Sequence, residues 1–173
     1  MAADKNYRSY ADTEDVVIIG ESISPPDESY SDTLKLSHVN RAAIYDTTIF
    51  GSQEDAIDIM RYSQLIHLKN CRLYGAGKYV VTIKGGCDLV ALENVIIEQH
   101  GKTVDIDLGN FTPITKARTT NVVLRNVTSS DGKPVRVRVL NADKPTVEGG
   151  NVKVIVYPKW VVKLVFMFLK IFN

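Results

Sequence analysis

Short polar residues recur along the chain at nearly constant spacing, with apolar and polar residues alternating on both sides of each. The recurring positions are separated by 24, 24, 24, 32 and 25 residues, and Val, Ile, Thr or Cys follows each one. An apolar alternation with a period of two predicts β-strands. The polar anchors that mark this register are Ser22, Asp46, Asn70, Asn94, Asn126 and Asn151.

The alternating apolar residues form two columns that we expect to face a common core. The first column lies four and two residues before each anchor: Ile18 and Gly20, Ala42 and Ile44, Ile66 and Leu68, Val90 and Leu92, Val122 and Leu124, Val147 and Gly149. The second lies about eleven and thirteen residues after it: Leu34 and Leu36, Ile57 and Ile59, Val81 and Ile83, Ile106 and Leu108, Val137 and Val139, Val162 and Leu164.

A repeat of this length predicts an all-β solenoid. One repeat of about 24 residues cannot bury its apolar face alone, so successive repeats must stack on one another. A parallel β-helix fits best. A leucine-rich repeat has a similar period, but it requires leucines at fixed offsets that this chain does not keep.

The polar anchors are expected to form a hydrogen-bonded ladder inside the solenoid. An asparagine amide has two donor hydrogens and an acceptor oxygen, so amides stacked one strand spacing apart, about 4.8 Å, can bond to one another. A buried rung without a partner would cost about 1–3 kcal/mol. We therefore interpret Asn70, Asn94 and Asn126 as structural residues rather than ligand-binding ones.

The rungs LKNC (68–71), LENV (92–95) and LRNV (124–127) resemble the asparagine ladder of the right-handed parallel β-helix, or pectate lyase-like, superfamily. That group includes pectate lyases, polygalacturonases and bacteriophage tailspikes. The resemblance covers residues 16–165 and implies a single-domain right-handed parallel β-helix of about six coils. It does not fix the function, because the fold carries lyases, hydrolases and inert structural proteins.

The remaining segments are interpreted around this solenoid. Residues 1–15 are expected to be an N-terminal arm or cap, and residues 24–31 and 109–119 to be insertions that leave the stack as loops. The apolar C-terminal run contains two lysines and is shorter than the roughly 20 residues of a membrane span. We expect residues 166–173 to form a cap or a strand at a subunit contact.

Composition narrows the class of partner. The chain has 173 residues, 45% of them hydrophobic, and a net charge of +1 without a basic cluster, which disfavours nucleic acid. The N-terminal residues lack the order of a secretory signal, so synthesis in the cytoplasm is expected. Cys71 and Cys87 are expected to be reduced, partly buried thiols.

Two short motifs nominate catalytic candidates by resemblance. EDAIDI (54–59) and QHG (99–101) look like the paired-aspartate and histidine motifs of polygalacturonases, which nominates Asp55, Asp58 and His100. The further aspartate and basic pair of those enzymes are missing, and those enzymes are much longer. An ion pair between Asp58 and Lys35 on the neighbouring coil would explain Asp58 without catalysis.

The outward positions of the first strand face contain no carboxylate pair of the kind that glycoside hydrolysis needs. Glu93 lies between Lys69 and Arg125, so cross-strand ion pairs are expected there. The three histidines have no spacing that would hold zinc, and the SSDGK turn (129–133) offers a single aspartate to calcium. No metal or cofactor is expected.

Apolar residues at outward positions suggest contact surfaces for other subunits. Tyr7 and Tyr10 in the N-terminal arm would tether the chain, although this segment is equally explained as a loose end or a cap. The candidate interface residues are Tyr7, Tyr10, Ile19, Ala43, Phe50, Tyr74, Ala91, Ile96, Val123, Phe166, Phe168 and Phe172.

These features together favour a non-catalytic structural protein of a larger assembly. The resemblance points to a phage virion surface component, either a head decoration (cement) protein or a short tail spike or fibre module. A homo-oligomer, with a trimer favoured, and a capsid or tail protein are the expected partners. The alternative is a polysaccharide lyase, a hydrolase or a glycan-binding module of the pectate lyase-like group.

Overall fold

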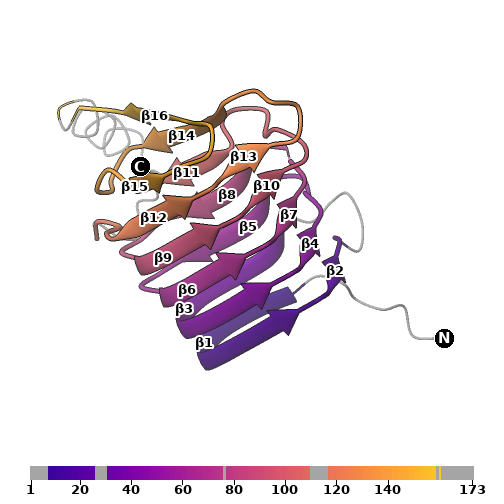
Figure 1. Ribbon diagram of the computed structural model, residues 1–173. Helices are drawn as coiled ribbons and strands as arrows, with labels where there is room; N and C mark the ends of the chain where they lie inside the picture. The colour runs from indigo at the N-terminus through magenta and orange to yellow at the C-terminus, as the bar shows by residue number, and fades with distance from the viewer. Residues whose placement is uncertain (1–7, 26–30, 76, 110–116, 159, 161–173) are drawn as a thin grey trace.

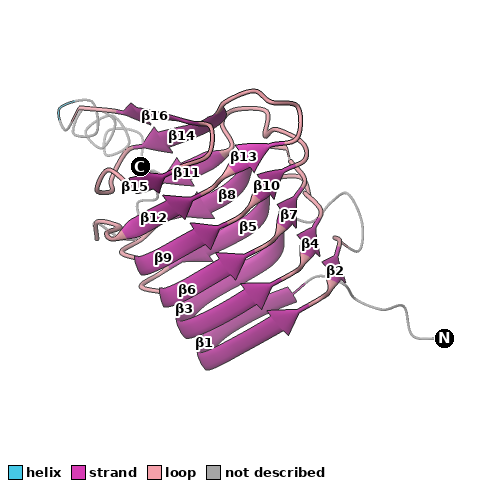
Figure 2. Ribbon diagram, viewed as in Figure 1, coloured by secondary structure: helices cyan, strands magenta, loops and turns pink. Residues whose placement is uncertain are grey.

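The chain winds through about five turns of stacked strands and forms a parallel β-solenoid (Figure 1). The computed structural model describes residues 8–25, 31–75, 77–109, 117–158 and 160. The assigned elements are all strands (Figure 2), and each pairs with its neighbours in parallel. The predicted all-β parallel β-helix is confirmed, with slightly fewer coils than the expected six.

Each turn places strands on three faces. The first face contains β6 (Gln64–Lys69), β9 (Asp88–Glu93), β12 (Val122–Arg125) and β15 (Thr146–Glu148). The second contains β5 (Asp55–Met60), β8 (Tyr79–Ile83), β11 (Ile106–Leu108), β14 (Val135–Val139) and β16 (Val152–Val156). The third is a separate sheet of short strands: β2 (Ser22–Ile23), β4 (Thr48–Ile49), β7 (Arg72–Leu73), β10 (Ile96–Ile97) and β13 (Thr128–Ser129).

Two long strands continue from the second face onto the first. They are β1 (Arg8–Ile19) and β3 (Asp32–Tyr45). The first half of β3 pairs with β5 and its second half with β6, so β3 joins the two faces into one sheet.

Apolar side chains fill the interior in columns that run along the stack. On the first face Ile44 pairs with Leu68 and Leu68 with Leu92, and on the second face Ile59 pairs with Ile83. All five are almost completely buried. Side chains two residues apart point to the same side of a strand. The inward columns predicted for the middle coils are therefore confirmed.

The first coil is shifted relative to the prediction. Val16 and Ile18 face its core, two residues earlier than expected. The prediction failed because Ser22 pairs with Thr48 on the third face and is not the counterpart of Asp46.

The last coil is shifted as well. Val154 and Val156 pair with β14 and continue the second-face column. Val162 and Leu164, the residues predicted for this position, lie outside the described residues.

The polar ladder exists, but it lies on the outside of a corner and not in the core. Asn70 Nδ2 donates to Asp46 Oδ1 at 3.0 Å, Asn94 Nδ2 to Asn70 Oδ1 at 3.2 Å, and Asn126 Nδ2 to Asn94 Oδ1 at 3.1 Å. All four residues are exposed, which corrects the expected burial. Each has φ between 50° and 54°, a left-handed conformation that Asn and Asp adopt more readily than other residues with a Cβ.

Glycines occupy the two end positions of this column in place of the predicted Ser22 and Asn151. Gly20 and Gly149 both have φ of 70°. A Cβ at Gly149 would lie 2.5 Å from Asn126 Oδ1, so Gly149 sits directly over the last amide of the ladder. Ser22 is exposed on β2, and Asn151 Nδ2 donates instead to a turn carbonyl at 3.0 Å.

The stack begins earlier than the sequence suggested. Because β1 starts at Arg8 and pairs with β3 along its length, residues 8–15 belong to the first coil. The proposed tether residue Tyr10 packs against the core. Tyr7, most of both insertions and residues 161–173 lie outside the described residues. Within the described part of the chain, no helix has the length and apolar character to cross a membrane.

Both cysteines are free and buried, as expected. Burial raises the pKa of Cys87 to about 12, so this thiol stays protonated and behaves as a small apolar side chain.

Candidate functional site

Three aspartates gather on the second face of the solenoid. Asp32, Asp55 and Asp58 each place one carboxylate oxygen within 4.8 Å of the other two, and none is more than 4% exposed. Glu54 N and Asp55 N both donate to Ser31 O, so the backbone at the start of β5 is irregular. Asp32 pairs with Asp55, and the register between β3 and β5 is unchanged from there to Met60.

Two lysines balance most of the charge in this cluster. Lys84 Nζ lies 2.9 Å from Asp58 Oδ1, and Lys35 Nζ lies 3.3 Å from Asp32 Oδ2 and 3.9 Å from Asp58 Oδ2. The predicted pair of Asp58 with Lys35 is thus present, although the closer partner is Lys84. Two ammonium groups against three carboxylates leave one negative charge in a buried site.

Below about pH 7 a proton on Asp55 offsets the remaining charge. Burial raises the pKa of Asp55 to about 7, and burial also raises the pKa of Asp58 against the opposing effect of Lys84. Asp55 Oδ1 has no hydrogen-bond partner among the described residues. Three carboxylates could in principle hold a cation. Because the ammonium groups of Lys35 and Lys84 already face these oxygens, we interpret the group as a buried ion cluster.

The polar row continues along the second face through residues that sequence reasoning did not single out. Arg138 Nε donates to the fully buried Asp107 at 2.7 Å, and Arg138 Nη2 donates to Tyr79 Oη at 2.7 Å. The guanidinium also lies 5.1 Å from the centre of the Tyr79 ring. The signal available in the sequence was the alternation of arginine with valine in β14, which places charge opposite Asp107.

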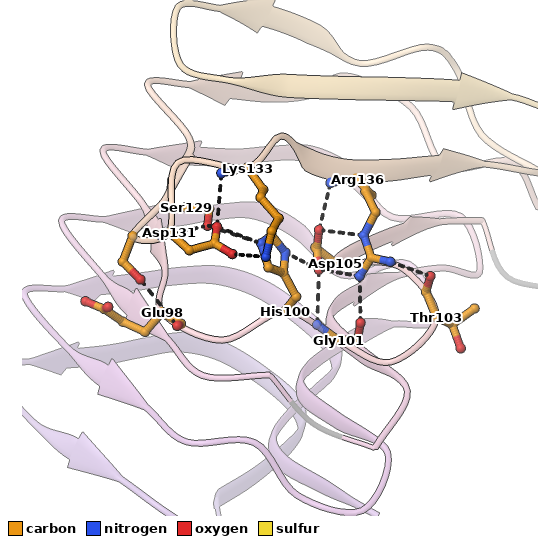
Figure 3. Close-up of polar contacts among 10 residues, drawn as sticks. Glu98, His100, Gly101, Thr103, Asp105, Ser129, Asp131, Lys133 and Arg136 are labelled. Atoms are coloured by element: carbon orange, nitrogen blue, oxygen red, sulfur yellow. Dashed lines mark hydrogen bonds and ion pairs between the residues drawn. The ribbon is translucent and has the colours of Figure 1, made fainter.

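A second polar network surrounds His100, in the loop after β10 (Figure 3). His100 Nδ1 lies 3.0 Å from Asp105 Oδ1, and His100 Nε2 lies 3.1 Å from Asp131 Oδ1 and 3.2 Å from Ser129 Oγ. The structure therefore separates the sequence candidates by their contacts. Asp55 and Asp58 lie together, whereas His100 contacts a different pair of aspartates.

Asp105 accepts most of the hydrogen bonds that hold this network together. Its carboxylate is fully buried and accepts hydrogen bonds from Gly101 N at 3.0 Å, Arg136 N at 2.7 Å and Arg136 Nη2 at 3.1 Å. Burial alone would raise the pKa of Asp105, but the hydrogen bonds from Arg136 outweigh it and lower that pKa. Asp105 is therefore ionised and holds the Arg136 guanidinium in place.

The distances around His100 resemble a Ser-His-Asp triad, but the hydrogen bonds do not. Ser129 Oγ donates to Asp131 Oδ1, so its proton is not directed at the histidine. Asp131 also accepts from Lys133 N at 3.0 Å and Lys133 Nζ at 2.7 Å, and Lys133 lowers the pKa of Asp131. His100 Nδ1 is also misaligned for a hydrogen bond to Asp105. Ser129, the last residue of β13, is thus not arranged as an activated nucleophile.

An open pocket of about 470 Å³ lies beside this network. It is bordered by the loop after β10, the turn after β13, and the adjacent strands β14 and β16. The residues that line it are His100, Lys133, Pro134, Arg136, Lys153 and Ile155.

The outward side of the first face contains the expected cross-strand ion pairs. Lys69 Nζ lies 2.9 Å from Glu93 Oε1, and Arg125 Nη1 lies 3.3 Å from Glu93 Oε2. Arg125 Nε also reaches Glu148 at 2.7 Å. These ion pairs link successive coils and confirm the structural explanation of Glu93.

Three candidate interface residues of this face share one register column, in which His67 lies between Ala43 and Ala91. Ala43, Ala91 and Val123 lie in one register column and are half-buried. Val17, which is 67% exposed, begins this column in place of the predicted Ile19, which is 57% exposed and belongs to the next column.

The remaining described candidates lie on or beside the third face. The rings of Phe50 and Tyr74 stack with their centres 4.6 Å apart, and both are half-buried, as is Ile96. Phe166, Phe168 and Phe172 lie outside the described residues.

Comparisons with protein-family models, with curated proteins and with solved structures found no match to this chain. The class is therefore defined by the fold itself, a parallel β-solenoid that carries a buried ion cluster, an open pocket beside His100 and an external polar ladder.

Proposed function

We propose that this protein is a non-catalytic structural module that joins a larger assembly through the open ends of its solenoid. The N-terminal end supports this. Among the described residues β1 pairs only with β3, so its other edge has unpaired backbone groups. Val17 and Ile19 expose more than half of their surface on the same strand. Such an edge is a template for pairing with another chain.

The C-terminal end of the described stack is open as well. Val147 and Val156 are 40% and 51% exposed, although their register places them at the end of core columns. A hollow of about 590 Å³ lies over this end, bordered by Lys144, Pro145, Val147, Val152, Val154 and Val156. Solenoids need a cap or a partner at such ends.

Within this function, a virion surface component is the specific role we propose, as a head decoration protein or a short tail spike or fibre module. The support is the resemblance of the asparagine rungs to β-helix proteins of phage particles. Symmetric self-association would bury the exposed apolar surfaces. A trimer is the favoured oligomer, by the same resemblance to phage tailspikes and fibres.

A glycan-active enzyme is the second candidate, and the aspartate and histidine motifs favour it. The geometry argues against Asp55 and Asp58 as its catalytic pair. Asp58 is 1% exposed and lies against Lys84, so a glycosidic oxygen cannot reach it in this arrangement.

Light scattering at micromolar concentration tests the assembly function. We expect an oligomer, and we expect the double variant Val17→Lys/Ile19→Lys to shift it to the monomer while remaining folded by circular dichroism. Ser130→Lys, at an exposed position directly after β13 on the third face, is the control and should leave the oligomer intact. A wild-type monomer would refute the proposal.

An activity assay separates the second candidate. Incubation with acidic polysaccharides should release neither unsaturated nor reducing sugars. Release that is lost in Asp58→Asn would overturn the non-catalytic assignment.

A further inference from the structure

We propose that the pocket beside His100 binds a compact ligand that carries an oxyanion, either a carboxylate or a phosphate, next to an apolar face. This inference goes beyond the assembly function and does not depend on it.

The charges around the pocket do not balance. Lys133, Arg136 and Lys153 line it, whereas Asp105 and Asp131 are the carboxylates in contact with these residues. One positive charge therefore remains even when His100 is neutral. Lys153 is exposed and forms no ion pair with any described residue.

The strand register concentrates this positive charge. Arg136 on β14 pairs directly with Lys153 on β16, so two cations lie side by side on adjacent strands. Like charges directly opposite one another destabilise a sheet, and an anion bound between them would remove that cost. On the first face, by contrast, Lys69, Glu93 and Arg125 alternate in sign from coil to coil.

The guanidinium is held ready for a ligand. Arg136 Nη2 donates to Asp105 Oδ1 and to Gly101 O, the latter at 2.6 Å. Arg136 Nη1 donates one hydrogen to Thr103 O at 3.3 Å. One Nη1 hydrogen is left, together with the ammonium donors of Lys153. Figure 3 shows Arg136 and His100 on either side of Asp105. A donor that is already fixed loses little entropy on binding.

The other walls are apolar. Pro134 lies at the turn between Lys133 and β14, and Ile155 is 40% exposed on β16. A pocket of about 470 Å³ falls within the range of small-molecule sites. The ligand class that fits is therefore a small ring with a carboxylate or phosphate at one edge, because an apolar ring face can cover Pro134 and Ile155.

Calorimetric titration of the intact protein at low salt tests this site with four probes. Glucuronate and glucose 1-phosphate carry the two oxyanions on a sugar ring, glucose lacks a charge, and inorganic phosphate lacks a ring. We expect both charged sugars to bind, with affinity that falls as salt rises, because a pocket open to water is screened. Preference between them identifies which oxyanion the site takes.

Variants link binding to the pocket. Lys153→Gln should raise the Kd of the preferred probe about tenfold, while the matched control Lys144→Gln, at the C-terminal end of the stack, should leave it unchanged. Binding of glucose as tight as that of the charged sugars, inorganic phosphate binding as tightly as them, or an unaltered Kd in Lys153→Gln would each overturn the inference. Loss of the oligomer has no bearing on these outcomes.

Discussion

At the scale of single residues, backbone conformation explains the asparagine column better than burial does. Asn70, Asn94 and Asn126 are exposed, so water can satisfy an amide that loses its neighbour. Their shared left-handed φ is the harder requirement, since a residue with a Cβ pays about 1–2 kcal/mol there. The glycines at both ends of the column meet the same requirement without a side chain.

Asn94 provides a test of this explanation. We expect Asn94→Ala to lower the free energy of unfolding by about 1–2 kcal/mol, because alanine tolerates the left-handed region poorly. Asn94→Gly should cost less, since glycine removes the side-chain hydrogen bonds but not the conformation. Urea denaturation measures both. Equal losses in the two variants would show that the amide hydrogen bonds, and not φ, determine the stability of the corner.

Asp55 makes stability depend on pH in a direction opposite to that of most carboxylates. Burial raises the pKa of Asp55 from 3.8 to about 7. Between about pH 4 and pH 7 the unfolded chain therefore binds fewer protons than the folded chain, and stability falls as pH rises through that window. The full effect is on the order of 4 kcal/mol.

Comparison with Asp55→Asn isolates this contribution. The variant should show a weaker decline between pH 4 and pH 7, because Asp58, whose pKa burial also raises, remains. It should keep the fall below pH 4 that ionised groups such as Asp105 produce. Urea unfolding at a series of pH values gives both curves. Parallel curves for wild type and variant would mean that Asp55 is already ionised in the folded protein.

Residue contacts within the regular coils were predictable, and those that depend on irregular backbone were not. The pairs of Glu93 with Lys69 and Arg125 follow from the register alone. Asp32 pairs with Asp55 in the register, but strict alternation along β5 would place Asp55 and Asp58 on opposite sides, so the sequence did not predict the cluster. Two neighbours of His100, Ser129 and Asp131, come from beyond the longest repeat, where the 32-residue spacing breaks the count.

At the scale of the elements, the loops between strands set how closely the coils can stack. Gly77 lies just before β8, and its amide donates to Ser52 O at 2.9 Å. A Cβ built at Gly77 would lie 1.7 Å from Gln53 O on the preceding coil. No side chain can be added there unless the backbone of one loop moves.

Gly77→Ala should therefore destabilise the protein clearly and lower its melting temperature. Gly132→Ala is the matched control, because Gly132 has φ of 74° but open space around it. The control should pay only the conformational cost, about 1–2 kcal/mol. Thermal unfolding compares the two, and a smaller loss at Gly77 would show that the loop adapts without strain.

The same scale shows where strand prediction failed. Positions in the middle coils were correct because the spacing of 24 residues holds from Asp46 to Asn94. At both ends the pattern points to a polar residue two positions after the true corner, Ser22 or Asn151, because the glycine at the corner gives no polar signal. A residue without a side chain is recognised there only by its φ.

At the scale of the whole molecule, none of the described strands closes either end of the solenoid along its axis. Figure 1 shows β1 at one end and β15 and β16 at the other, with each coil in contact only with its neighbours between them. The sequence predicted this architecture because one repeat of about 24 residues cannot bury its apolar face alone. It did not predict the complete ion cluster or the pocket beside His100, because both include residues from irregular segments and loops outside the regular alternation.

The regular spacing of the external polar ladder, from Asp46 to Asn94, would let the chain gain whole coils by duplication. From Asp46 to Asn70 and from Asn70 to Asn94 the chain advances by identical steps, and each new amide meets the one before it in the same way. A tandem copy of residues 71–94 would enter the stack as one more interchangeable unit, about 4.8 Å tall, without altering the pairing of any other strand. The solenoid can thus be lengthened by whole coils of 24 residues.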